Sequence, residues 1–97
     1  MTFKDTTVII TGGSDGVGAA VARLFAEAGA NLVLAARGKR KLEALAEELR
    51  AKTQVEIFPM DVADAEACAG VFRKSEYEFG RVDIHVNNAG FHQRASF

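Results

Sequence analysis

Short runs of β-branched and aliphatic residues alternate along the chain with longer stretches in which apolar residues recur every three or four positions. The short runs predict strands at residues 6–10, 32–35, 55–60 and 82–86. The longer stretches predict three helices, whose apolar stripes are Val17, Val21, Leu24, Phe25 and Ala28, then Leu42, Leu45, Ala46 and Leu49, then Ala65, Cys68, Ala69 and Phe72. Strands joined by helical crossovers must run parallel. The pattern therefore predicts the order β-α-β-α-β-α-β, one half of a doubly wound α/β sheet.

Glycine and proline mark the expected ends of these elements. Gly29 stands where a left-handed glycine commonly follows a helix, and Gly80 follows a third helix expected to run to about Phe79. Pro59 lacks the N–H that a strand ladder needs, so it predicts the end of the third strand.

The stretch from Thr11 to Gly18 joins the first strand to the first helix and has the composition of a phosphate-binding turn. A phosphate needs backbone N–H groups aimed at it and room for close approach, and glycines at a helix N-terminus supply both. The alternative is a tight strand–helix turn with no ligand. A Walker-type loop does not fit, because no Gly-Lys-Ser/Thr follows. The candidate residues in this turn are Gly12, Ser14, Asp15, Gly16, Val17 and Gly18.

Ala36 and Arg37 follow the second predicted strand, where sites that prefer NAD usually place a carboxylate for the ribose 2′-hydroxyl. The guanidinium of Arg37 offers planar, charged donors that suit a 2′-phosphate instead, which favours NADP over NAD. The alternative is that Arg37, Lys39 and Arg40 form a solvated loop.

Two further polar clusters end the third and fourth predicted strands. Asp61 can accept a hydrogen bond from the amino group of adenine while Val62 lines the ring; the alternative for Asp61 is a helix N-cap, which Asp64 could fill equally well. The run Asn87–Gly90 can bridge neighbouring strands and reach a ribose, although alone it would be a turn.

Composition adds limits to this picture. The chain has 97 residues, 48% hydrophobic and 26% charged, with a net charge of −1, which suits one soluble domain over residues 1–97. The densest basic run is Lys39–Lys41, too short to predict a nucleic-acid surface. One cysteine, Cys68, excludes an internal disulfide, and the apolar run Leu32–Ala36 is far too short to span a membrane. We expect a cytoplasmic domain with no membrane partner.

Four motifs in order, Thr-Gly-x-x-x-Gly-x-Gly, Ala-Arg, Asp-Val and Asn-Asn-Ala-Gly, resemble the classical short-chain dehydrogenases/reductases from about Thr6 to Gly90. The resemblance implies a Rossmann-type fold with sheet order 3-2-1-4 and a nicotinamide dinucleotide cofactor. It assigns the pyrophosphate to Gly12, Ser14, Gly16 and the backbone of Val17, the 2′-phosphate to Arg37, the adenine to Asp61 and Val62, and the adenosine ribose side to Asn88, Ala89 and Gly90. Asn87 would steady the central strands.

The chain departs from the family pattern at three places. Asp15 stands where many NADP-preferring members carry a basic residue, and a carboxylate there would repel a 2′-phosphate. His85 occupies a strand position usually held by an aliphatic residue, and we expect a hydrogen-bonded core histidine rather than a catalytic one. The family's Asn-Ser-Tyr-Lys catalytic set should lie beyond Phe97, since Tyr77 is followed at i+4 by Arg81 and fits a helix surface.

Two functions remain open from the sequence. The first is the cofactor-binding portion of an NAD(P)-dependent oxidoreductase that transfers hydride between nicotinamide and a carbonyl or alcohol substrate, with the catalytic half absent and residues 1–97 inactive alone. The second is a stand-alone dinucleotide-binding module without catalysis. The family order also makes the fourth strand a sheet edge without proline, lysine or bulge glycine, which predicts self-association through that strand.

Overall fold

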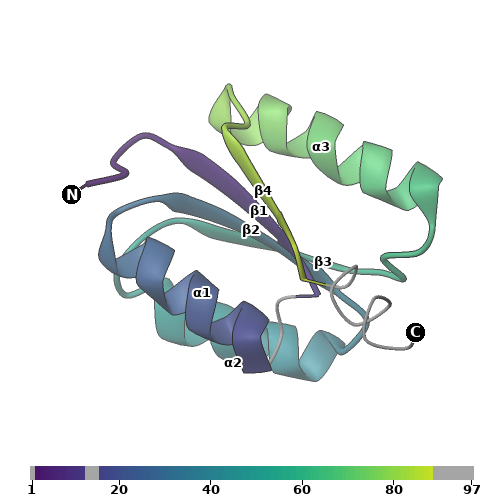
Figure 1. The fold of residues 1–97 in the computed structure, drawn as a ribbon, viewed down its shortest axis with the longest axis horizontal. Helices are drawn as coiled ribbons and strands as arrows, with labels where there is room; N and C mark the ends of the chain where they lie inside the picture. The colour runs from purple at the N-terminus through teal and green to yellow at the C-terminus, as the bar shows by residue number, and fades with distance from the viewer. Residues whose placement is uncertain (1, 13–15, 89–97) are drawn as a thin grey trace.

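A four-stranded parallel sheet lies between helices on its two faces in the computed structural model, which describes residues 2–12 and 16–88. The elements follow the predicted order: β1 (Thr7–Thr11), α1 (Gly16–Glu27), β2 (Asn31–Ala36), α2 (Lys39–Leu49), β3 (Val55–Pro59), α3 (Ala65–Phe79) and β4 (Ile84–Asn87). The sheet order is β3-β2-β1-β4, as predicted. Helices α1 and α2 cover one face and α3 covers the other (Figure 1). The doubly wound α/β architecture is confirmed.

The core has two layers because β1 and β2 are buried on both faces. Ile10 and Leu34 face α1 and α2, while Ile9 and Val33 face α3. The stripe predicted for α2 is confirmed, since its buried residues are Leu42, Leu45, Ala46 and Leu49. Near-continuous apolar strands are what a sheet covered on both faces requires.

The stripe predicted for α1 is wrong in part. Val17 and Leu24 are 63% and 71% exposed, and the buried residues of α1 are Gly18, Ala19, Ala22 and Ala26. Small side chains allow the helix backbone to lie close to the sheet, so the larger residues flank the contact instead of filling it. Val21 and Phe25 flank it on the partly buried side and pack against the core. Val17 and Leu24 remain an apolar surface with no covering element among the described residues.

The predicted stripe of α3 is also rotated from the observed one. Val71 and Ser75 are buried, Cys68 and Phe72 are half-buried, and Ala65 and Ala69 are exposed. The buried Ser75 hydroxyl donates to the Val71 carbonyl at 2.7 Å, which satisfies it inside the helix. A period of 3.6 residues made both stripes plausible, and the polar Ser75 concealed the correct one.

The predicted end signals are confirmed. Gly29 has φ +89° and follows α1 with the hydrogen-bond pair of a Schellman motif, from Gly29 N to Ala26 O and from Ala30 N to Phe25 O. Gly80 follows α3 with φ +80°. Strand β3 ends at Pro59.

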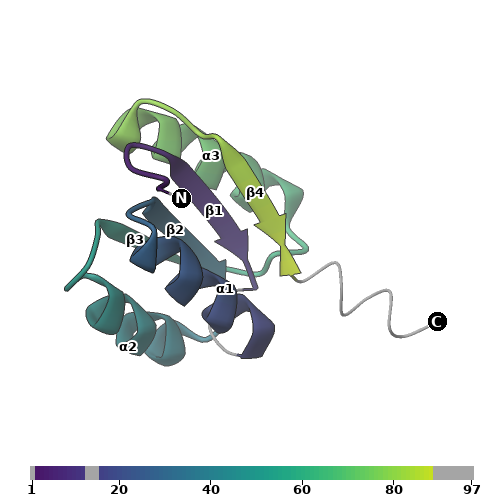
Figure 2. The same ribbon diagram turned by 60° about the vertical axis from the view of Figure 1, so that its left-hand side comes forward.

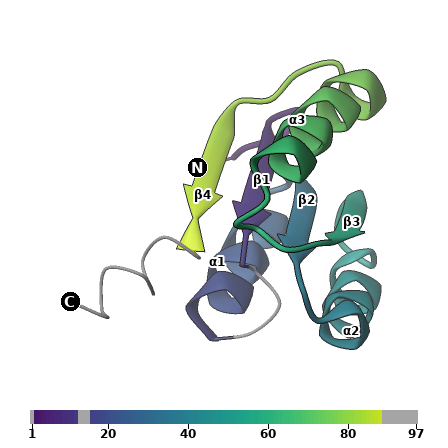
Figure 3. The ribbon, with the colours of Figure 1, turned by 90° about the vertical axis from the view of Figure 1, so that its right-hand side faces the viewer.

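The fourth strand begins later than the alternation of Val82, Ile84 and Val86 suggested. Ile84 and Val86 pack on the α1 face, whereas Val82 precedes the strand and packs on the α3 face. Asp83 makes the change of face possible, because its N–H donates to the Thr7 carbonyl at 3.0 Å and its carboxylate accepts from the Thr7 N–H at 2.9 Å. Figure 3 shows β4 at one edge of the sheet and β3 at the other.

Candidate functional site

Most of the predicted site residues that the structure describes lie along one edge of the sheet. In a parallel sheet all strands end on the same side, so Thr11, Ala36, Pro59 and Asn87, the last residues of β1 to β4, share this edge. Gly12, Arg37, Asp61 and Asn88 come one or two residues after those ends in the sequence. Figure 2 shows the arrowheads of β1 and β4 on the same side of the sheet. This carboxyl-end edge is where open α/β sheets bind ligands.

Gly12 is held from both sides as it leaves β1. Its N–H donates to the Ala35 carbonyl at the end of β2 at 2.6 Å, and its own carbonyl accepts from the Asn88 side-chain amide at 2.9 Å. Gly12 has φ +77°, in the left-handed region that favours glycine. The start of the glycine-rich stretch is thus fixed by the strands on either side of β1.

The remaining glycines of the stretch are partly described. Gly16 opens α1 with φ +57°, and a Cβ there would meet no atom within 4 Å, so the space beside it is open. Gly18 is buried on the sheet side of α1, and Val17 is exposed. Ser14 and Asp15 lie outside the described residues.

Asn88 is buried, and its side-chain amide donates to the Gly12 carbonyl. The resemblance implied that Asn87 steadies the central strands, but the bond to the Gly12 backbone is made by Asn88. The Asn87 side-chain oxygen accepts from the Thr11 hydroxyl at 3.4 Å. Ala89 and Gly90 lie outside the described residues.

Arg37 is exposed immediately after β2. Its guanidinium forms no hydrogen bond or ion pair with another residue of the described ranges, whereas Arg23 and Arg81 are each paired with a carboxylate. Arg37 therefore stands at the carboxyl-end edge with its donors available for an anion.

The structure separates the two carboxylates that follow β3. Asp64 is the N-cap of α3, because its Oδ1 accepts from the N–H groups of Glu66 and Ala67 at 3.0 Å each. Asp61 is exposed, and its carboxylate accepts one hydrogen bond among the residues described, from the Ala63 N–H to Oδ1 at 2.9 Å. The N-cap alternative for Asp61 is therefore wrong. Val62 beside it is half-buried.

His85 was expected to be a hydrogen-bonded core residue, and only half of that expectation holds. Its Nε2 lies 3.2 Å from the Thr11 hydroxyl, and its ring packs edge-on against Phe72 with centroids 5.1 Å apart. The residue is nevertheless exposed as a whole, since it lies in the edge strand β4. Cover on one side of the ring lowers the pKa of His85 by partial desolvation. In the sequence, His85 was notable because the family usually has an aliphatic residue at this position. Nothing in the sequence indicated Thr11 as its hydrogen-bond partner.

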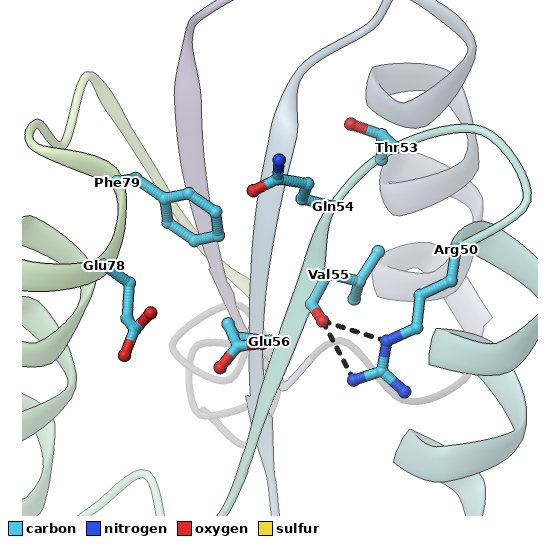
Figure 4. Close-up of a pocket in the computed structure, with 7 residues that line it drawn as sticks. All are labelled: Arg50, Thr53, Gln54, Val55, Glu56, Glu78 and Phe79. Carbon is cyan, nitrogen blue, oxygen red and sulfur yellow. Dashed lines mark hydrogen bonds between the residues drawn. The ribbon is translucent and has the colours of Figure 1, made fainter.

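A cavity lies elsewhere, away from the residues predicted to bind a ligand. A hollow of about 330 Å³ is lined by Arg50, Thr53, Gln54, Val55, Glu56, Glu78 and Phe79. It lies where β3 begins and α3 ends, opposite the carboxyl-end edge, and the Arg50 guanidinium there donates to the Val55 carbonyl at 3.1 and 2.9 Å (Figure 4). No residue singled out from the sequence lines it.

Other expected roles are limited by exposure and composition. Tyr77 is 86% exposed on α3, in agreement with its prediction as a surface residue. Within residues 2–12 and 16–88, no group of three acidic, histidine or cysteine side chains could hold a metal ion. No helix of that part of the chain is both long and apolar enough to cross a bilayer.

The parallel sheet, its alternating helices and the glycine turn at its carboxyl-end edge define a Rossmann-type α/β domain. Residues 6–97 match the model of the short chain dehydrogenase family, and the chain belongs to that family. The resemblance stated from the four motifs is thereby confirmed.

Named relatives and solved structures agree with this assignment. The chain is 42% identical over 91 residues to an uncharacterized oxidoreductase of Mycobacterium tuberculosis, covering 90% of this chain and 27% of the relative. It resembles the crystal structure of a short chain dehydrogenase from Bacillus anthracis, with a TM-score of 0.83, 38% identity, and coverage of 90% of this chain and 35% of that one. L-sorbose reductase from Gluconobacter frateurii, solved with NADPH and L-sorbose, gives a TM-score of 0.85 at 38% identity, covering 91% of this chain and 34% of that one. The chain thus spans about a third of the length of these proteins.

Proposed function

We propose that residues 1–97 bind a nicotinamide dinucleotide at the carboxyl-end edge, as the cofactor-binding portion of an NAD(P)-dependent short-chain oxidoreductase. The observation that carries the proposal is the convergence of the motif residues on one edge, with Gly12 fixed between β2 and β4. The oxidoreductase names of the relatives and the NADPH in L-sorbose reductase support the same chemistry.

Each residue has a binding role that follows from its chemistry. Backbone N–H groups of Ser14, Gly16 and Val17, with the positive end of the α1 dipole, would hold the pyrophosphate. Gly12, whose N–H is bonded to Ala35, would turn the chain beside the pyrophosphate without a Cβ in the way, and Gly18 would let α1 lie close. Asp61 would accept from the adenine amino group beside Val62, while Asn88, Ala89 and Gly90 would line the ribose. The bound nicotinamide would supply or accept hydride for a carbonyl or alcohol substrate.

NADP is the cofactor we favour over NAD. Arg37 directly follows β2, where the 2′-phosphate would lie, and its guanidinium donors pair with no residue of 2–12 or 16–88. Asp15 opposes this preference if it faces the same phosphate, so replacing it by arginine should strengthen NADPH binding.

The proposal does not give residues 1–97 a catalytic step. Hydride transfer to a carbonyl also needs a proton donor, and the acid/base tyrosine and lysine of the family pattern have no match in this sequence. A stand-alone dinucleotide-binding module is the second candidate, because the proposed binding residues do not by themselves require a catalytic step. A serine followed by Tyr-x-x-x-Lys in a longer sequence of this protein would support the enzyme.

We place the protein in the cytoplasm with no nucleic-acid or membrane partner, on the grounds of its near-neutral charge and single cysteine.

Calorimetric titration with NADPH and NADH, followed by a hydride-transfer assay on a carbonyl panel, tests the proposal. We expect saturable binding of NADPH, weaker binding of NADH and no turnover. Absence of binding for both cofactors contradicts the binding role. Turnover that is lost in Tyr77→Phe contradicts the assignment of Tyr77 to the surface and of catalysis to residues outside this chain.

A further inference from the structure

His85 and Thr11 meet on the α3 face of the sheet, next to the proposed cofactor edge. His85 is paired with Ile9 in the parallel register of β4 and β1, and Thr11 lies two residues beyond Ile9 on the same face. The two side chains are therefore diagonal neighbours across the strands, and His85 Nε2 lies 3.2 Å from Thr11 Oγ1. The edge-on contact with Phe72 of α3 limits the orientations of the imidazole ring.

The hydrogen-bond inventory around Thr11 gives this contact a direction. The Thr11 hydroxyl also lies 3.4 Å from the Val86 carbonyl and 3.4 Å from the Asn87 side-chain oxygen, both of which only accept. A hydroxyl has one proton to donate. Thr11 can donate it to one of these oxygens only if it does not donate it to His85 Nε2. The arrangement that satisfies more groups has His85 Nε2–H donating to Thr11 and the Thr11 hydroxyl donating to β4.

Thr11 is the last residue of β1 and precedes Gly12, the first glycine of the proposed phosphate-binding turn. Gly12 is already fixed by Ala35 through its N–H and by Asn88 through its carbonyl. The hydrogen bond from His85 would fix the residue before it. Three neighbouring points would then hold the exit of the chain from β1.

We propose that His85 is a positioning residue: through Nε2–H it orients the Thr11 hydroxyl and thereby holds the exit of the glycine-rich stretch in the conformation that receives a dinucleotide. The effect on cofactor affinity rests on the proposed function. The effect on the Gly12 backbone does not, and it can be measured without a cofactor.

Amide hydrogen exchange of Gly12, read by NMR, tests the backbone effect in four single variants and one double variant. His85→Leu restores the aliphatic residue usual at this position and should speed exchange about two- to tenfold, the range expected for one hydrogen bond. Thr11→Val removes the hydroxyl and should give a similar change, with no further increase in the double variant. His85→Gln, whose amide can reach the place of Nε2–H, and Thr11→Ser, which keeps the hydroxyl, should stay near the original rate.

The same variants titrated with NADPH distinguish the two proposals. We expect His85→Leu to weaken NADPH binding by the same factor and His85→Gln to restore it. If the original chain binds NADPH but His85→Leu changes neither exchange nor affinity, the inference about His85 is overturned. Additive effects of His85→Leu and Thr11→Val, or no rescue by His85→Gln, overturn it as well. If exchange responds as expected but no dinucleotide binds, the proposed function fails and the positioning contact stands.

Discussion

The preference that we propose for NADP over NAD depends on one side chain, Arg37, which directly follows β2. Because its guanidinium has no ion pair within the described ranges, its removal should cost little stability. We expect Arg37→Ala to weaken NADPH binding by ~1.5–3 kcal/mol, the range for hydrogen bonds to charged groups, and to change NADH binding little. Calorimetric titration of both cofactors measures the difference.

The matched control for Arg37→Ala is Arg73→Ala, which removes the same charge from the exposed surface of α3. It should leave both affinities unchanged. If Arg37→Ala weakened the binding of NADPH and NADH equally, Arg37 would be an ordinary residue of a solvated loop, which is the alternative that the sequence left open.

His85 gives a second prediction, on stability against pH. Burial of one side of the ring lowers the pKa of His85 below its ordinary value of 6.5, so between the two pKa values the unfolded chain binds more protons than the folded chain. The contribution of His85 is therefore present above about pH 6.5 and is lost as the pH falls through that value toward the lower folded pKa. We expect His85→Gln to lose less stability than the original chain between about pH 8 and about pH 5.

Urea unfolding at several pH values compares the two chains. His92 is present in both, so the difference between their curves isolates His85. Parallel curves would mean that the imidazole is as solvated in the folded chain as in the unfolded one.

At the level of elements, Asp64 caps the start of α3, and Asp61 is the carboxylate that we propose for adenine. Asp64→Ala removes the N-cap and should lower the free energy of unfolding by ~0.5–2 kcal/mol, with NADPH affinity unchanged once the chain is folded. Asp61→Ala should do the reverse, weakening NADPH and NADH alike with a smaller effect on stability. Urea unfolding and calorimetry on the same two variants test the division. An adenine role for Asp61 is contradicted if both variants change only stability.

Some features of the helices and strands could be predicted from the sequence, and others could not. Order, parallel direction and the ends at Gly29, Pro59 and Gly80 followed from local patterns, because backbone conformations and missing N–H groups are properties of single residues. The buried faces of α1 and α3 did not, since they depend on how closely a helix approaches the sheet. In α1 the small residues make the contact with the sheet. In α3 a serine is buried because its hydroxyl donates a hydrogen bond within the same helix.

For the candidate site too, the sequence predicted what depends on chain order but not the contacts between residues of different strands. Chain order was enough to predict that the motifs would meet at the carboxyl-end edge. The hydrogen bonds that hold Gly12 between Ala35 and Asn88, and the contact of His85 with Thr11, join residues from different strands. Such pairs follow from strand register, which the sequence did not specify to the residue.

For the whole molecule, two features favour association. Strand β4 pairs only with β1 within the described chain, so its other edge is unpaired, and Val17 and Leu24 are exposed on α1. Unpaired strand edges and exposed apolar side chains each favour contact between copies of a chain. We expect residues 1–97 to self-associate through these surfaces, and Leu24→Glu to reduce the association.

Size-exclusion chromatography with light scattering over a concentration series measures the effect. Tyr77→Glu is the matched control, because it also replaces an exposed large side chain with a carboxylate, but on α3. A chain that stays monomeric with a concentration-independent melting transition would contradict the prediction.

We propose that NADP(H) binds at the carboxyl-end edge, and an NMR titration of the isotope-labelled chain with NADPH measures this binding residue by residue. The amides of Gly12, Gly16, Val17, Arg37, Asp61 and Asn88 should shift saturably, while those around the cavity at Arg50, Val55 and Glu78 should stay unchanged. NADH should shift the same glycine-turn amides with a smaller effect at Arg37. Shifts confined to the cavity at the opposite edge, or no saturable shifts at all, would contradict binding at the carboxyl-end edge.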